Sequence, residues 1–141
     1  MTTRATARKV AMADVAPDRR RGADVRVLLS PRSAGTTSGF NGVVTMGVGE
    51  RVSAHHHPYS EEFLFVVRGR IRVQLDGTET ELAAGDSLLI PPYCSHRLVN
   101  DADEEAFVVF HLGPLAPRPE LGHVDTETEL PEPARSEGRP A

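Results

Sequence analysis

Residues 49–69 read GERVSAHHHPYSEEFLFVVRG, a stretch in which three consecutive histidines are followed by two consecutive glutamates. In an extended strand, residues i and i+2 point to the same side about 6–7 Å apart, so His55 and His57 can direct two imidazoles at one point. Glu62 lies an odd number of residues after His57, so its carboxylate returns to that point only if the chain turns between them. The stretch therefore predicts a metal site on a strand, completed across a turn by Glu62, with His56 facing away.

A second stretch, GDSLLIPPYCSHRLVN at residues 85–100, supplies a third imidazole from His96 after a proline-containing loop. Three neutral nitrogens and one carboxylate suit Zn²⁺, Fe²⁺, Ni²⁺, Mn²⁺ or Cu²⁺ better than Ca²⁺ or Mg²⁺. On an octahedral ion, four protein ligands would leave two positions open for water or substrate, as metal catalysis requires. Two alternatives remain open: Glu62 could hold an imidazole instead of the ion, and the triple histidine could form a solvated loop.

The rest of the chain reads as short β-strands separated by glycine and proline, without a helical period. Asp76-Gly77 predicts a tight hairpin, because these residue types accept the positive φ angles of a type I′ turn. Strands are expected at residues 24–29, 39–48, 62–67, 70–75, 78–82, 87–90, 96–100 and 106–112. This spacing is typical of a single all-β domain, a β-sandwich or small barrel of the jelly-roll kind.

The 141 residues suffice for one domain with extensions at both ends. Residues 1–23 are expected to form an N-terminal arm that could supply a strand to a second copy, and residues 24–112 the barrel. Residues 113–141 are rich in proline and acids, so we expect a tail that lacks structure from Thr126 onward. The part from Gly113 to His123 could lie as an extended arm across the body or across a neighbouring copy. Edge strands that need cover predict a homodimer.

Composition excludes several classes of chemistry. Of the sixteen basic residues only Lys9 is a lysine, so a Schiff-base or P-loop lysine has no candidate in the core. The lone Cys94 allows no internal disulfide and is expected to be buried and inert. A net charge of −4 with scattered basic residues argues against nucleic acid, and Arg19–Arg21 is expected to be solvated or at a subunit contact. Without a long apolar segment or signal peptide, we expect a cytoplasmic protein with no membrane partner.

The two histidine stretches resemble the paired motifs of the cupin superfamily. The first motif is matched by Gly49, His55, His57, Glu62 and Gly69, and the second by Gly85, Pro91, His96 and Asn100. The one departure is Tyr93, where the family usually has glycine; this is expected to change the turn before His96 and to place a phenol at the pocket mouth. The resemblance implies a cupin double-stranded β-helix, which is a jelly-roll barrel.

Further segments resemble the small cupin cyclases of bacterial aromatic polyketide pathways, of the tetracenomycin and resistomycin kind, over about residues 9–125. These segments are Arg20–Gly22, Leu28–Pro31, Thr37–Phe40, His57–Phe63 and Phe110–Pro117. The resemblance implies a zinc-containing subunit that helps to fold a poly-β-ketone chain into fused aromatic rings, alone or within a polyketide synthase complex. An Fe²⁺-dependent dioxygenase or quinone-forming oxygenase acting on an aromatic substrate, and a non-enzymatic small-molecule-binding cupin, remain alternatives.

For such a cyclase, His111 on the last apolar strand is a candidate general base if it points inward; the alternative is a hydrogen-bonded structural histidine. If His111 binds the ion, Glu62 becomes a candidate base in its place. The expected substrate pocket combines loop aromatics with aliphatic residues on the Glu62 side of their strand: Tyr59, Tyr93, Leu64 and Val66. Phe63 and Phe65 then face the other way, and His56 and His123 fall outside the site.

Overall fold

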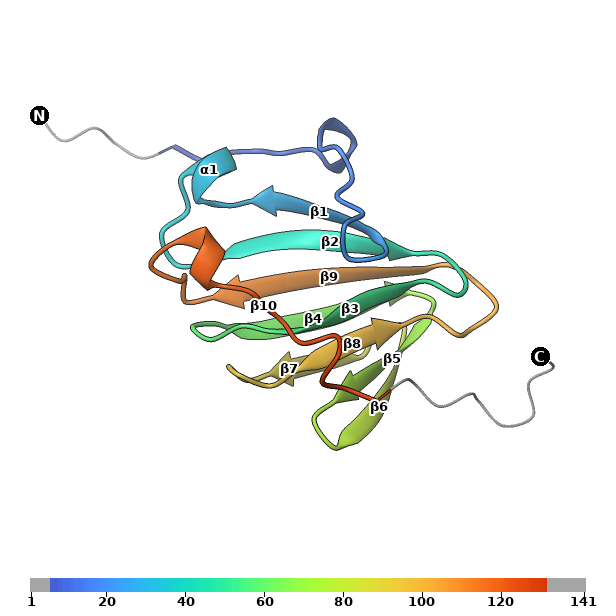
Figure 1. Ribbon diagram of the computed structural model, residues 1–141. Coiled ribbons are helices and arrows are strands. Elements are labelled where there is room, and N and C mark those ends of the chain that lie inside the picture. The colour runs from blue at the N-terminus through green and yellow to red at the C-terminus, as the bar shows by residue number, and fades with distance from the viewer. Residues whose placement is uncertain (1–5, 132–141) are drawn as a thin grey trace, which may run out of the picture.

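The computed structural model describes residues 6–131, which form two antiparallel β-sheets packed face to face (Figure 1). The first sheet contains, in spatial order, β1 (Asp24–Leu29), β2 (Phe40–Met46), β9 (Ala106–Gly113), β4 (Glu61–Arg68) and β7 (Ser87–Ile90). The second contains β10 (Val124–Asp125), β3 (Arg51–His56), β8 (His96–Val99), β5 (Arg70–Leu75) and β6 (Thr78–Ala83). The expected all-β architecture is therefore confirmed.

The helices are short. They are η1 (Met12–Asp14), α1 (Pro31–Ala34) and η2 (Pro119–Leu121). Within residues 6–131, no helix is long and apolar enough to cross a membrane.

Strand β4 shows how alternation builds the core. Leu64 and Val66 are buried between the sheets on the same side as Glu62, whereas Phe63 and Phe65 lie on the outer face, 45% and 43% exposed. The sequence predicted this division correctly, because successive side chains of a strand point to opposite faces. The hairpin between β5 and β6 is also confirmed, with Gly77 at a φ of 73°.

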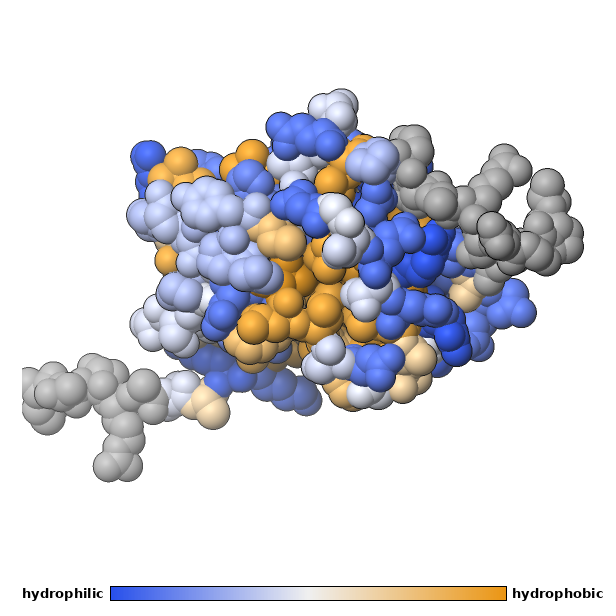
Figure 2. All heavy atoms as spheres, turned by 90° about the horizontal axis from the view of Figure 1, so that it is seen from below, coloured by the Kyte–Doolittle hydropathy of each residue, from blue (hydrophilic) through white to orange (hydrophobic). Residues whose placement is uncertain are grey.

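The outer face of the first sheet carries apolar side chains near its β4–β7 edge. Phe63 lies opposite Leu89, which is 53% exposed, and Val67 is 47% exposed. Seen from below, apolar side chains gather at the centre of the molecule between hydrophilic margins (Figure 2).

The N-terminal arm folds back onto its own chain. Asp18 pairs with Val25 at the start of β1, and the backbone N–H of Ser53 donates to the carbonyl of Arg21 at 2.9 Å. Gly22 has a φ of 109°, and a Cβ there would lie 2.4 Å from the carbonyl oxygen of Arg51. Only glycine allows the arm to cross β3 this closely.

Residues 113–131 form a segment that we call the C-terminal strap, and it packs against the second sheet. Its strand β10 pairs with β3, and Thr126 is 3% exposed. Arg97, which is fully buried, bonds to the Glu127 carboxylate at 2.9 Å and to the Pro131 carbonyl at 2.8 Å. The expectation that structure is lost from Thr126 onward is thereby corrected as far as Pro131. Residues 132–141, which carried the same expectation, lie outside the described residues.

Candidate metal centre

Four buried side chains meet between the two sheets. Each of His55, His57, Glu62 and His96 offers one ligand atom, and these atoms all lie within 4.8 Å of one another. His55 and His96 are cross-strand partners on β3 and β8, while Glu62 faces them from β4 of the opposite sheet. The chain turns between β3 and β4, as it must for the Glu62 carboxylate to return to His55 and His57. The structure thus brings together all four of the residues expected to hold a metal.

The three imidazoles of this cluster share one orientation. In each ring, Nδ1 lies within hydrogen-bond distance of a backbone carbonyl, which can only accept. The pairs are His55 with Ser53 at 2.7 Å, His57 with Gly122 at 2.8 Å and His96 with Cys94 at 2.9 Å. A proton on Nδ1 leaves the Nε2 lone pair free for a metal ion, and such outer contacts orient the ligands of metal sites.

One atom of the cluster lacks a partner. His57 Nε2 is buried and has no hydrogen bond among the described residues; the Glu62 Oε1 atom lies 3.4 Å from it. A buried polar atom left without a partner costs free energy, so an unfilled nitrogen aimed at other donors is a feature of ligand sites. Three imidazole nitrogens and one carboxylate oxygen could therefore bind a divalent ion here.

Charge in the cluster is concentrated on one pair. Glu62 Oε1 lies 2.9 Å from His96 Nε2. Burial alone would raise the pKa of Glu62, but the adjacent imidazoles of His57 and His96 hold that pKa well below its usual range. Burial likewise opposes a charge on His96, yet contact with Glu62 raises the pKa of His96. Burial, with His96 nearby, lowers the pKa of His55 to about 2, so this ring is neutral.

A fourth imidazole comes from the C-terminal strap. The ring of His123 stacks on His55 with centroids 4.4 Å apart and 16° between the planes, and it lies 5.6 Å from the His57 ring. Burial, followed by the charge of Arg21, lowers the pKa of His123 to about 4. The expectation that His123 falls outside the site is corrected. The only sequence signal was its place in a segment expected to lie across the body.

His111 lies on the other side of the first sheet. On β9 the buried residues are Phe110 and Leu112, so His111 between them points outward and is exposed. Its ring lies 5.8 Å from that of Phe63 on the outer face. The position expected for His111 beside the ion is therefore corrected, and the described residues offer no candidate base at this point of β9.

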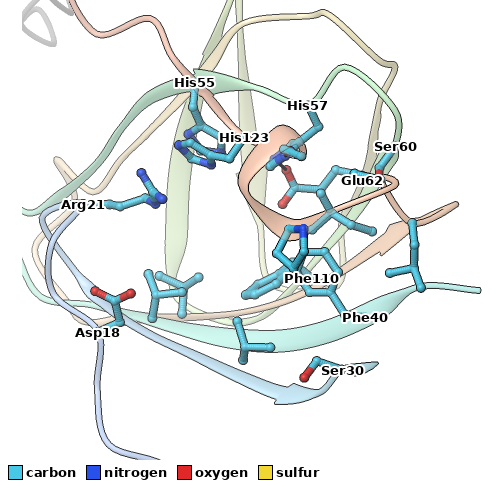
Figure 3. A pocket seen from close by; sticks show the side chains of 18 of the residues that line it. Asp18, Arg21, Ser30, Phe40, His55, His57, Ser60, Glu62, Phe110 and His123 are labelled. Carbon is cyan, nitrogen blue, oxygen red and sulfur yellow. Dashed lines mark hydrogen bonds and ion pairs between the residues drawn. The ribbon is translucent and has the colours of Figure 1, made fainter. Parts of the chain in front are cut away.

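A cavity of about 700 Å³ adjoins the cluster, and His55, His57 and Glu62 form part of its wall (Figure 3). The surface of its walls is mainly apolar, although polar side chains such as Arg21 and Ser60 also line it, and the rings of Phe40 and Phe110 are in edge contact at 6.3 Å.

Of the four residues expected to line the substrate pocket, Leu64 does so. Val66 lies in the core away from the cavity, and Tyr59 and Tyr93 are exposed to solvent. The aromatic residues that line the cavity are Phe40 and Phe110, and Phe110 also belongs to the buried core, with Phe40 packed against it.

Tyr93 keeps the turn that a glycine would make. Its φ is 66°, in the left-handed region, and its ring lies 5.6 Å from that of His56. The turn before His96 is therefore formed although Tyr93 stands where cupins usually have glycine. The phenol of Tyr93 does not line the cavity.

The three arginines at residues 19–21 of the N-terminal arm have different surroundings. Arg19 pairs with Glu50 and Arg20 with Asp18, both near the surface. The guanidinium of Arg21 is partly buried and points into the cavity toward His55 and His123 (Figure 3). The expectation of a solvated triplet is thus corrected for this residue.

Comparisons with known proteins agree with the fold and the motifs. A family model described as "Cupin domain" matches residues 42–112. Protein SchB of Streptomyces halstedii is 58% identical, covering 89% of this chain and 91% of its own length. Polyketide synthase CurC of Streptomyces cyaneus is 55% identical (85% and 78% covered), and tetracenomycin polyketide synthase protein TcmJ of Streptomyces glaucescens is 46% identical (94% and 88%).

A solved structure shares the architecture. The polyketide cyclase RemF of Streptomyces resistomycificus superposes with a TM-score of 0.66 at 19% identity, over 80% of this chain and 83% of that one. At this identity the likeness concerns the fold.

Proposed function

The chain belongs to the cupin family, and from this premise we propose that it is a metal-dependent cyclase that folds a poly-β-ketone intermediate into aromatic rings. Two relatives, at 55% and 46% identity over most of the chain, are named as polyketide synthase proteins, which supports a polyketide as substrate. The cyclisation itself and its dependence on metal are our inference from the site.

The observation that carries the proposal is the junction of the four-ligand cluster with an apolar cavity of about 700 Å³. This volume lies within the range of about 300–1,000 Å³ that small-molecule sites occupy. A polar cluster in the wall of a mainly apolar cavity suits a substrate that is largely hydrocarbon but carries regularly spaced carbonyl oxygens.

His55, His57, Glu62 and His96 would hold the ion, with zinc preferred and iron, nickel or manganese as alternatives. When bound there, a divalent ion supplies Lewis acidity toward carbonyl and enolate oxygens. Glu62 serves as a ligand in this proposal, because its Oε1 atom lies between two of the imidazoles. The side chains around the cavity exclude water and limit which carbons of the chain can meet, which is where ring-closure specificity arises.

Replacing His57 or His96 with alanine tests the proposal. We expect loss of bound metal by elemental analysis, together with a changed product pattern when the variant is supplied to a synthase that makes the poly-β-ketone. His56→Ala is the matched control, because this neighbour points away from the cluster toward Tyr93. Unchanged cyclisation by a metal-free variant would contradict the mechanism, and metal-dependent oxygen uptake with an aromatic substrate would favour an oxygenase.

We also propose that the protein acts as a homodimer, in contact with a polyketide synthase. Phe63 and Phe65 on β4 and Leu89 on the edge strand β7 are exposed apolar residues. A second copy that packs on this face would remove them from water, which supports the dimer. Light scattering coupled to size exclusion tests the dimer, and a monomer at micromolar concentration would contradict it.

A further inference from the structure

Arg21 is an unpaired cation in the wall of the cavity. Among residues 6–131, its guanidinium has no hydrogen bond or ion pair, although its side chain is partly buried. Asp18, the acid nearest in sequence, is bound by Arg20 through contacts of 2.6, 2.9 and 3.1 Å. Burial and the like charge of Arg20 lower the pKa of Arg21, whereas Asp18 and Asp125 act on it more weakly. The guanidinium donors that lack a protein partner can form charge-assisted hydrogen bonds with a ligand oxygen in the cavity.

His123 presents a second unfilled polar atom at the same end of the cavity. Its Nε2 atom is sealed from solvent and has no hydrogen bond among the described residues. Figure 3 shows the His123 ring beside His55, with the Arg21 guanidinium extending toward both. Neither side chain belongs to the four-ligand cluster.

Both residues are held in place through β3, the strand that also carries His55. The carbonyl of Arg21 accepts from Ser53 of β3, and Gly22 allows the close crossing that follows. His123 directly precedes β10, whose Val124 is the register partner of His56. Because each is fixed to the strand next to the metal ligands, their positions relative to the cluster are set by the fold.

Resting on the proposed function, we propose that Arg21 and His123 form an oxygen-binding subsite for a carboxylate or enolate of the polyketide chain, beside the four-ligand cluster. The guanidinium supplies charge-assisted donors, and the imidazole supplies one further hydrogen bond. A chain held by one oxygen at the cluster and another at this subsite has a fixed register along the cavity. The subsite would therefore select which carbonyls lie close enough to condense.

The test uses naphthalene-2-carboxylate as an anionic probe and naphthalene-2-carboxamide as its neutral match. Binding is measured by isothermal titration calorimetry on the purified protein, with metal content determined for each sample. We expect the wild-type protein to prefer the carboxylate by about tenfold or more, as for a hydrogen bond to a charged group. Arg21→Gln should reduce the preference to within about twofold of none, and His123→Leu should reduce it less. Arg68→Gln removes an equal charge from an exposed ion pair outside the cavity and should leave the carboxylate preference unchanged.

Three results would overturn the subsite: no carboxylate preference in the wild-type protein, an undiminished preference in Arg21→Gln, or an equal loss in Arg68→Gln. A carboxylate held by the metal would instead lose its preference in His57→Ala and keep it in Arg21→Gln. Because the probe needs no cyclisation, failure of the proposed enzyme activity and failure of this subsite give different results. Thermal unfolding of each variant verifies that it is folded.

Discussion

His57 Nδ1 donates a hydrogen bond of 2.8 Å to the carbonyl oxygen of Gly122, so a ligand of the candidate metal centre is oriented by the C-terminal strap. The other two imidazoles take their carbonyl partners two residues away in the sequence, whereas this contact spans 65 residues. The position of His57 therefore depends on docking of the strap.

Removing the part of the strap from Gly122 onward should weaken metal binding while leaving all four ligands in the chain. We expect a chain that ends at Leu121 to bind zinc at least about tenfold more weakly in a chelator competition, the loss typical of outer contacts to metal ligands. A chain that ends at Pro131 is the control, since it keeps the strap. Equal zinc affinity of the two chains would refute the dependence.

Glu127 should contribute measurably to folding stability because it lies against the buried Arg97. It also accepts from Arg51 at 3.0 Å and from the backbone of Ala54. We expect Glu127→Gln to lower the free energy of unfolding in urea by about 1–2 kcal/mol, allowing for partial exposure of the carboxylate. Glu120→Gln, in an exposed pair with Arg118, should have no measurable effect. Equal effects of the two changes would contradict the assignment.

The same carboxylate predicts a pH dependence. Burial would raise the pKa of Glu127, but Arg97 and the Ala54 N–H outweigh it and lower that pKa below the usual 4.5. A depressed pKa in the folded state means that the stabilisation is present above the unfolded value and is lost as the pH falls through the folded one. The difference in unfolding free energy between wild type and Glu127→Gln should hold at roughly neutral pH and shrink steadily below about pH 4. A difference that does not vary with pH would contradict this.

Tyr93 should be replaceable by glycine with a gain in stability. Its φ of 66° is one that a residue with a Cβ adopts at a cost, and its side chain is 66% exposed, so little packing is lost. We expect Tyr93→Gly to raise the free energy of unfolding by about 0.5–1 kcal/mol, measured by thermal or urea unfolding. Tyr93→Ala keeps the Cβ and should give no such gain; a gain of the same size in both variants would argue against backbone relief.

His111 should be dispensable for the chemistry. Because it points to the outer face, His111→Ala is expected to retain the metal content and the product pattern of the wild-type protein. The comparison with His57→Ala in the same assay separates a histidine of the cluster from one on the opposite side of the sheet. Loss of product with His111→Ala would require another route from the outer face to the cavity.

The parts that sequence could predict are those in which spacing determines direction. Alternation along an extended chain was enough to pair His55 with His57, and a required turn was enough to return Glu62 to them. The direction of His111 could not be read in this way, because the residues of β9 are apolar on both faces: Val108 and Phe110 are buried, but Phe107 and Val109 are also half-buried. Without a polar face, the sequence of that strand does not reveal which side faces the core.

The contributions of the two chain extensions were inaccessible for a different reason. Arg21 and His123 reach the cavity through contacts with β3 that join residues far apart in the sequence, and neither lies in a periodic segment. The proline-rich and acidic composition of the strap resembles that of unstructured chains. Its order comes from specific contacts, above all those of Arg97 with Glu127 and Pro131, which composition does not record.

The Gly122 carbonyl also bears on the order of events during synthesis. A nascent chain that has emerged from the ribosome as far as Gly113 already contains every ligand of the candidate centre, yet it lacks the acceptor that orients His57. Such a chain would hold the proposed ion without the outer contact that orients His57. On the proposed metal binding, full affinity would arise only once the strap is complete, and a chain halted before Gly122 would hold the ion more loosely.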